Sequence, residues 1–326
     1  MNKNLRMPAL LLSLPPLFFV TVSAKAEVTL KKTDEALVLL RGEAPILTYH
    51  VAEVPPPEGV DPVYRRSGFI HPLHAPSGGK VSGIHPADHY HHLGLWHAWV
   101  KTKYGKHAPD FWNLGRRTGL IRHAGMAKLR KAGFTVKQEQ LAYLHGPDKP
   151  PTVILAETLA VDAAFTDGAN VIDYALSQTN VTKKALEFPA YRYGGGIAYR
   201  GPLSWNKSNS DYLTSEGLDR TNSHATRARW VAMGGPAEAG PDGRGKGKPA
   251  TVVILCHPEN RDAPQRIRTW DNGKVFFNYV PTQETAWSIQ PGQSHLLRYR
   301  LLIFDGNPAP KQIEAHWKTY AAGKAR

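Results

Sequence analysis

Short runs rich in β-branched and aromatic residues recur along the whole chain, and clusters of glycine, proline, asparagine and aspartate separate them. Such runs are typical of β-strands, and the clusters between them are typical of turns. No long helical patterns lie between the runs, so we expect an all-β fold, a large antiparallel sandwich or barrel. The predicted strands are Ala36–Leu40, Ile46–Val51, Leu93–Val100, Phe134–Leu144, Val153–Val161, Val171–Asn180, Gly196–Tyr199, Arg227–Met233, Thr251–Cys256, Lys274–Val280 and His295–Phe304.

Only one segment has the spacing of an amphipathic helix. Within Pro310–Ala322, the residues Ile313, Trp317 and Tyr320 fall on one helical face, which predicts a C-terminal helix packed on the outside of the sheets. No stretch after residue 26 separates two parts of different composition, so we expect a single β-sandwich domain over residues 27–326. Loops are expected at Val54–Arg66, Gly146–Pro151 and Gly234–Pro249, and the last is rich enough in glycine and charge to be mobile.

Residues 1–26 have the form of a secretory signal peptide. Lys3 and Arg6 precede an apolar stretch, and Ala24-Lys25-Ala26 has the small-x-small form of a cleavage site. The apolar stretch is short and contains Pro15-Pro16, which favours a cleaved signal over a retained anchor. No later segment is apolar enough for a membrane-spanning helix. The mature protein is therefore predicted to lack an integral membrane segment and to be periplasmic or secreted.

The chain is basic, with 41 Lys and Arg against 27 Asp and Glu and a formal net charge of +14. The basic residues are dispersed and form no nucleic-acid motif, so no nucleic acid is expected as a partner. The charge favours an acidic glycan, and a merely solvated basic surface is the alternative. Cys256 is the only cysteine, which excludes an internal disulfide, and its apolar strand-like run predicts a buried thiol.

Titratable side chains are most concentrated in His85-Pro-Ala-Asp88-His89-Tyr-His91-His92. Imidazole titrates near neutrality and is the commonest metal ligand, so this histidine segment could serve proton transfer, metal binding or sugar recognition. If a strand begins near Asp88, alternation puts His89 and His91 on one face, and Asp88 and His92 on the other.

A metal site would then need a third ligand from outside the segment. His71 and His85 are the nearest candidates in sequence, and each precedes a proline, which favours extended or turn conformations at a sheet edge. The metal alternative is a divalent ion held by His71, His89 and His91, with an open position for water or a sugar hydroxyl. The metal-free alternatives are acid–base catalysis and binding by the same imidazoles.

Sugar sites combine an aromatic platform with paired hydrogen-bond donors and acceptors. Trp112-Asn113 and Asn278-Tyr279 offer both, and we expect them, with His71 and His85, to contact substrate. Core packing is the alternative for Trp112. Three other tryptophans lie in strand-like runs and are expected in the core: Trp96, Trp99 and Trp230.

Two arginines and two further titratable groups complete the candidate site. Arg192 precedes a run of glycines where backbone could approach a ligand closely, and Arg192 and Arg200 are each suited to pairing with a carboxylate. Glu216 lies beside a turn glycine and is the carboxyl group we expect to work with a histidine in acid–base catalysis. His257 follows an apolar strand and could reach a cleft at its end.

Five blocks of the sequence resemble the PmoA-like family of exported bacterial proteins of unknown function. They are Ser67–Leu73, Asp88–Trp96, Asp110–Asn113, Arg192–Gly195 and Ala228–Val231. The family name refers to a methane monooxygenase subunit with several membrane spans, and this chain has no such spans. The resemblance implies a galactose-mutarotase-like β-supersandwich, a fold shared by carbohydrate-active epimerases, lyases and hydrolases.

These observations predict an exported carbohydrate-active lyase or epimerase that uses His89, His91 and His92 together with Glu216. Proton abstraction needs a base near neutrality and a group that stabilises the developing oxyanion, and histidines with an arginine or a metal supply both. No convincing second carboxylate is present, so a glycoside hydrolase is disfavoured. A non-catalytic glycan-binding protein is the alternative. A redox metalloprotein is disfavoured because cysteine and methionine ligands are scarce.

Overall fold

Two eight-stranded antiparallel sheets form the framework of residues 27–323, which the computed structural model describes. The predicted signal peptide, residues 1–26, lies outside the described residues. In spatial order, the first sheet contains β1 (Val28–Lys32), β2 (Ala36–Arg41), β3 (Ala44–His50), β4 (Ile70–Leu73), β5 (Leu95–His97), β11 (Ile197–Arg200), β16 (Phe276–Val280) and β15 (Arg266–Thr269).

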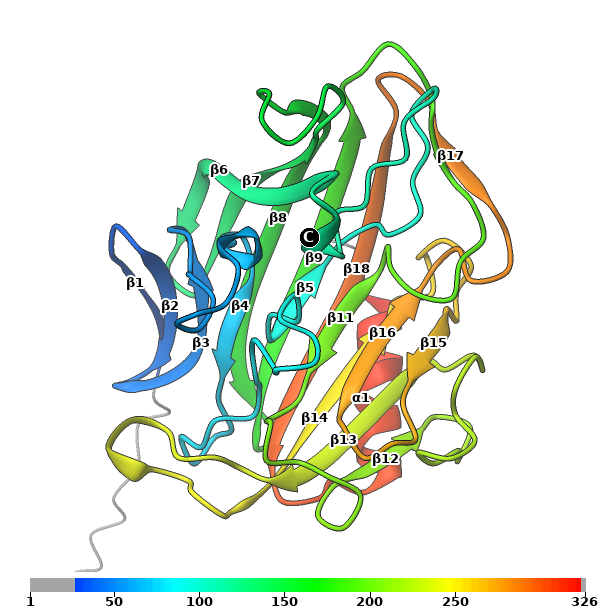
Figure 1. Cartoon of the computed structure of the whole chain (residues 1–326). Coiled ribbons are helices and arrows are strands. Elements are labelled where there is room, and N and C mark those ends of the chain that lie inside the picture. The colour runs from blue at the N-terminus through cyan, green and yellow to red at the C-terminus, as the bar shows by residue number, and fades with distance from the viewer. Residues whose placement is uncertain (1–26, 324–326) are drawn as a thin grey trace, which may run out of the picture.

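The second sheet lies against the first (Figure 1). Its strands, in spatial order, are β12 (Asp211–Thr214), β13 (Trp230–Pro236), β14 (Pro249–Cys256), β18 (Ser294–Asp305), β9 (Ala169–Asn180), β8 (Thr152–Thr166), β7 (Gly133–Ala142) and β6 (Gly119–Arg130). The remaining elements are the pair β10 (Leu186–Phe188) and β17 (Trp287–Ile289), the 3₁₀ turns η1 (Pro62–Tyr64), η2 (Leu114–Arg116) and η3 (Pro241–Gly243), and α1 (Pro310–Ala322).

The sheets bury a common apolar core between them. Leu95, Ile197 and Phe277 of the first sheet are fully buried in the same core as Ile254 and Leu301 of the second. Because side chains alternate along a strand, the residues beside them in sequence point to the opposite, outer face of the first sheet.

Helix α1 covers the outer face of the second sheet, where Figure 1 shows it behind β13 and β14. Ile313 is buried against Trp230 and Leu302, and Trp317 and Tyr320 pack beside it. The predicted antiparallel sandwich with a C-terminal helix over Pro310–Ala322 is confirmed. None of the helices in residues 27–323 has the length and apolar character needed to cross a membrane.

The glycine-rich loop is shorter than predicted, and its first residues are attached to neighbouring loops. Gly234–Pro236 belongs to β13, and β14 begins at Pro249. Glu238 forms an ion pair with Lys80 at 2.9 Å and accepts a hydrogen bond from Ser204 Oγ at 2.9 Å. The backbones of Glu238 and Lys80 also exchange two hydrogen bonds. The start of this loop is therefore held against the segment around Lys80.

Candidate functional site

The histidine segment is a pair of turns and not a strand. The His89 backbone N–H donates to the Pro86 carbonyl at 2.8 Å, and the His92 N–H donates to the His89 carbonyl at 2.9 Å. The His85 N–H donates to the His92 carbonyl and closes the segment into a loop. The prediction that His89 and His91 lie on one face of a strand and His92 on the other is therefore wrong. Turns of this kind fold the imidazoles toward one another.

The three imidazoles meet on the outer face of the first sheet. The His92 ring stacks on His89 at 4.8 Å and meets the edge of His91 at 4.9 Å. Phe276 stacks on the other side of His92 at 4.9 Å and 15°. We call this group the histidine–tryptophan cluster, and its rings are His89, His91, His92, Trp96, Trp112, Trp270 and Phe276.

A carboxylate and a lysine lie at the exposed edge of the cluster. Asp88 Oδ2 is 3.1 Å from His89 Nδ1 and also contacts the Lys274 ammonium. Partial burial raises the pKa of Asp88, but the Lys274 and His89 side chains beside it outweigh this effect and lower the pKa overall. Asp88 is thus an anion at neutral pH. A carboxylate 3.1 Å from Nδ1 favours the tautomer with the proton on that nitrogen, which leaves the Nε2 lone pair of the same imidazole free.

Arg200 is buried beside this edge without a carboxylate partner. Its residue is 4% exposed, and its Nε and Nη1 atoms have no hydrogen-bond partner among the described residues. The guanidinium carbon lies 5.7 Å from the centre of the Trp270 ring. Burial lowers the pKa of Arg200, but a guanidinium keeps its charge in proteins.

Other buried polar atoms around the cluster also lack partners. Within the described residues these are His85 Nε2, His89 Nδ1, His92 Nδ1 and Trp96 Nε1, and His89 Nδ1 lies 3.1 Å from Asp88 without the geometry of a hydrogen bond. An unpaired buried donor or acceptor costs about 1–3 kcal/mol, and native proteins retain few of them. Their concentration beside Arg200 marks the place where hydroxyl or carboxylate groups of a ligand, or ordered water, would be bound.

The buried imidazoles are neutral at physiological pH. Burial lowers the pKa of His91 to about 4, with a smaller contribution from His89. Burial also puts the pKa of His92 well below its usual value. Burial and nearby positive charge, chiefly Lys80, lower the pKa of His71 to about 3. Neutral imidazoles offer one donor and one acceptor each, which suits sugar hydroxyls.

These low pKa values predict that acid weakens the fold. An unfolded histidine has a pKa of about 6.5, whereas folded His91 and His295 both titrate at about 4. Between these values the unfolded chain binds more protons than the folded one, so the free energy of unfolding falls as the pH falls. Urea titrations at intervals from neutral pH downward measure this slope. His91→Gln and His295→Gln should each reduce it, and an unchanged slope in both variants would contradict the assignment.

Asn113 and Arg192 lie beside the cluster. Trp112, which belongs to the cluster, is not an open platform. Trp112 is fully buried against Trp96 at 5.1 Å and Tyr193 at 5.4 Å. Asn113 Nδ2 donates to the Asp110 carboxylate at 2.8 Å and to the Tyr193 hydroxyl at 3.2 Å. Arg192 is exposed, with its guanidinium 5.7 Å from the Tyr193 ring. The half-buried rings that could face a sugar are therefore Trp270 and Tyr193.

The substrate-binding roles predicted for Asn278, Tyr279 and His71 do not fit their positions. Tyr279 is fully buried between the sheets, and its hydroxyl donates to the Ala228 carbonyl at 3.2 Å. The Asn278 amide is equally buried and donates to backbone carbonyls, including Gly196 O at 3.2 Å. His71 Nδ1 is engaged with the Ser82 hydroxyl at 2.9 Å.

Glu216 and His257 lie on the other side of the sandwich, beside α1. Glu216 pairs with Arg229 at 3.0 Å, and the same guanidinium lies 3.4 Å from Glu314 of α1. His257 is buried and meets the edge of Tyr320 of α1 at 5.0 Å. The expected partnership of Glu216 with the histidine segment is therefore wrong. The carboxylate beside the histidines is Asp88.

The predicted metal centre is not formed by these residues. Among residues 27–323, no three His, Cys, Asp or Glu side chains are arranged to hold a metal ion. His71 bonds to Ser82, and His89 turns its Nδ1 toward Asp88. The triad of His71, His89 and His91 therefore does not assemble.

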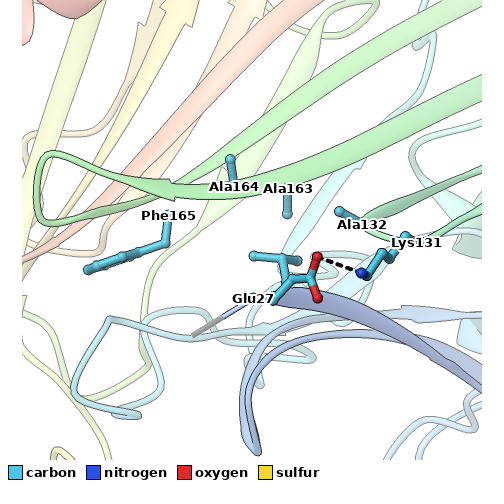
Figure 2. Close-up of a pocket in the computed structure, with 7 residues that line it drawn as sticks. Glu27, Lys131, Ala132, Ala163, Ala164 and Phe165 are labelled. Carbon is cyan, nitrogen blue, oxygen red and sulfur yellow. Dashed lines mark ion pairs between the residues drawn. The ribbon is translucent and has the colours of Figure 1, made fainter. Parts of the chain in front are cut away.

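Two grooves on the surface lie away from the cluster. One has a volume of about 510 Å³ and lies between β1 and the ends of β7 and β8 (Figure 2). Its lining is mainly alanine and phenylalanine, and its one ion pair, Glu27–Lys131 at 2.6 Å, is largely exposed. The other, about 320 Å³, is lined by residues of η1 and η2. Neither groove brings unpaired buried polar atoms together. We therefore take the histidine–tryptophan cluster, and not a groove, as the candidate site.

Sequence reasoning missed the contribution of Trp270 and Lys274. Both belong to Trp270-Asp-Asn-Gly-Lys274, the turn between β15 and β16. A tryptophan directly before an Asp-Asn-Gly turn lies at a strand end, where large rings are often accessible, and this signal could have identified it. Its distance of about 180 residues from the histidine segment hides the contact in the sequence.

Comparison with known families assigns the chain to one family. A family model described as a family of unknown function (DUF6807) matches residues 36–318. The chain belongs to the DUF6807 family. This match does not confirm the PmoA-like name that the sequence blocks suggested. No curated protein matches the DUF6807 chain.

Solved structures with low similarity to this DUF6807 protein include carbohydrate enzymes. A polysaccharide lyase has 10% identity and a TM-score of 0.36 over 86% of this chain, which spans only 32% of the lyase. A galactose mutarotase related enzyme from Lactobacillus acidophilus has 8% identity and a TM-score of 0.36, with 86% and 98% of the two chains covered. A putative mutarotase from Salmonella typhimurium has 7% identity and a TM-score of 0.34, with 85% and 94% covered. None is similar enough to assign an activity.

Proposed function

We propose that this DUF6807 protein is an exported carbohydrate-active enzyme, a lyase or epimerase, with its active site at the histidine–tryptophan cluster. The observation that carries the proposal is the Asp88–His89 pair beside the unpaired Arg200 guanidinium. This arrangement holds a base and a positive charge on one face of the sheet. Half-buried Trp270 supplies an apolar surface for a sugar ring.

His89 is the residue best placed to take a proton. Its Nδ1 faces Asp88, and its side chain is 34% exposed, so substrate can reach the imidazole. In an epimerase, Nε2 accepts a proton from a carbon next to a carbonyl or carboxylate, and a proton returns to the other face of that carbon. In a lyase, the electron pair released by the same step forms a C=C bond, and the neighbouring C–O bond breaks with its electrons passing to oxygen. That oxygen then takes up a proton.

Arg200 complements this step through its charge. Removal of a proton next to a carboxylate moves negative charge onto the carboxylate oxygens, and a fixed guanidinium stabilises that charge most strongly where water is excluded. His91 and His92 are neutral, with pKa values lowered mainly by burial. They are suited to hold hydroxyl groups, whereas their low pKa values make them weak bases.

A non-catalytic glycan-binding protein is the second candidate. The observation that favours it is the neutral state of His91 and His92, since recognition needs donors and acceptors but no proton transfer. The same rings and unpaired polar atoms would serve binding alone. Turnover separates the two candidates.

The test is incubation of the purified protein in D₂O with a panel of acidic and neutral oligosaccharides. A lyase or epimerase should introduce deuterium at one ring carbon or produce an unsaturated sugar, and both products are visible by NMR. Asp88→Asn should slow the reaction because it removes the carboxylate that orients His89. Saturable binding without either product would favour the binding protein. Absence of both binding and turnover across the panel would contradict the carbohydrate proposal.

A further inference from the structure

Three arginines are buried in the described residues, and Arg200 differs from the other two. Arg66 is 2% exposed, and Glu157 supplies an opposite charge that acts on it within the core. Arg220 is 8% exposed and donates from Nη2 to the Ser210 carbonyl at 2.6 Å and the Ser210 hydroxyl at 2.7 Å. Arg66 Nε and Nη1 are also unpartnered, but its Nη2 donates to the His97 carbonyl at 3.2 Å. Arg200 has the Trp270 ring beside it, and its two unpartnered nitrogens have no buried carboxylate to balance their charge.

The nearest carboxylate does not neutralise Arg200. Asp88 attracts the guanidinium at a distance, but its Oδ2 is already engaged by Lys274 and His89. Burying a cation without a bonded anion is strongly unfavourable. A site of this kind becomes favourable when a ligand provides the missing anion, and a guanidinium fork matches the two oxygens of a carboxylate.

We infer that Arg200 recognises a carboxylate of the substrate, so that the site takes a glycan containing uronic acid. This inference rests on the proposed function and names its substrate class. The two unpartnered nitrogens, Nε and Nη1, lie on different edges of the guanidinium, and each shares its edge with Nη2, so one carboxylate can accept two parallel hydrogen bonds from either edge. Trp270 lies beside the guanidinium and offers its ring to the apolar face of the same sugar.

The surroundings of Arg200 suit an anionic chain longer than one sugar. In the register of the sheet, Arg268 of β15 lies opposite Asn278 of β16, and Asn278 lies opposite Ala198 of β11. Because side chains alternate along a strand, Arg268 is on the same face of the sheet as Arg200. Arg268 Nη1 lies 2.9 Å from His224 Nε2, and the positive charge of Arg192 acts on Arg268. The negative charges that act on these groups come from Asp88, near Arg200, and from Asp271, near His224.

Recognition of a substrate carboxylate by Arg200 also accounts for the position of the base, His89, near this arginine. A carbon next to a carboxylate carries the most acidic C–H bond of a uronic acid residue. When Arg200 holds the carboxylate, the charge that develops on proton removal moves toward the guanidinium. One side chain would thus select the substrate and stabilise the developing charge.

The test is isothermal titration with oligogalacturonate and with the same oligosaccharide after reduction of its carboxyl groups. The wild-type protein should bind the acidic form about 30-fold or more tightly than the reduced form, since a buried charge pair usually contributes at least that factor. Arg200→Gln should lose this preference and leave binding of the reduced form unchanged. Arg200→Lys should retain part of it because it keeps charge but not the two parallel donors.

Arg220→Gln is the matched control, since Arg220 is also buried and also lies over an aromatic ring, at 4.7 Å from Tyr212. It should leave both affinities unchanged. Equal binding of the two oligosaccharides by the wild type would overturn the role of Arg200 and leave a carbohydrate function intact. Binding of neither would overturn both. If Arg200→Gln does not fold, the wild-type preference for the acidic form and its weakening by salt decide the question.

Discussion

Replacing Glu157 by alanine is expected to lower the free energy of unfolding by about 3–5 kcal/mol. Its carboxylate is buried between the sheets and accepts three hydrogen bonds from side chains. Oε2 accepts from His97 Nε2 at 2.9 Å, and Oε1 accepts from Gln140 and Gln178, both at 2.6 Å. Burial raises the pKa of Glu157, but the interactions with His97 and the glutamines lower it overall, so the group is anionic.

The large effect comes from the groups that the alanine variant leaves behind. Arg66 would lose the carboxylate that balances its buried charge. Urea-induced unfolding followed by tryptophan fluorescence measures the change. Glu139→Ala is the matched control on the neighbouring strand β7, where Glu139 pairs with Arg122 in a partly exposed bridge worth about 1 kcal/mol or less. A loss for Glu157→Ala no larger than that of the control would show that the buried network contributes little.

Replacing His89 by alanine is expected to reduce turnover by about 10²–10⁴-fold, the range for removal of a general base. The melting temperature should change little, because the side chain is 34% exposed and Asp88 keeps its contact with Lys274. Steady-state kinetics on the substrate found in the D₂O experiment, together with a thermal melt, measure both effects. Unchanged turnover would exclude His89 as the base.

A control histidine makes this result specific. His145→Ala, at an exposed position after β7, should affect neither turnover nor melting. His91→Ala should weaken substrate binding more than it slows the chemical step, because the His91 pKa of about 4 makes it a weak base. If His91→Ala instead lowers kcat as strongly as His89→Ala, the proton acceptor is not His89 alone.

Most of the long strands that bury one or both faces were predictable from the sequence, whereas short strands such as β4 and β15 and the exposed edge strand β6 were not. β14 is an apolar run buried along almost its whole length, and its predicted range differs from the observed one by two residues. β6 is the edge strand of the second sheet, and most of its side chains are exposed or half-buried. An edge strand has little need for apolar alternation, so its sequence lacks the pattern on which prediction depends.

Local chain geometry also limited the strand predictions. A strand was expected over Leu93–Val100, but β5 covers only Leu95–His97. Gly94 has a φ of +67°, and a side chain there would meet the Ile70 carbonyl at 2.5 Å. The chain therefore enters the sheet through a left-handed turn, and only the residues after Gly94 can pair with β11.

The centre of the candidate site was visible in the sequence, but its partners were not. The density of imidazoles identified the histidine segment, while the pairing that brings Trp270 and Phe276 to it joins residues about 180 positions apart. Asn278 and Tyr279 show a second limit. The alternation of side chains along a strand shows that these two residues point to opposite faces of the sheet, but it does not show which of the two faces is buried in the core.

The three residues of β5 connect the buried network to the candidate site. Trp96 belongs to the histidine–tryptophan cluster, whereas His97, the next residue, is held on the inner side by Tyr174 at 2.7 Å and Glu157 at 2.9 Å. A variant that disturbs the inner side would also displace Trp96 and so impair catalysis. Variants of Glu157 or His97 would therefore be inactive although neither residue touches substrate, and activity alone would mistake the two for a catalytic acid–base pair. Only inactive variants that keep the melting temperature of the wild type would identify residues that act on substrate.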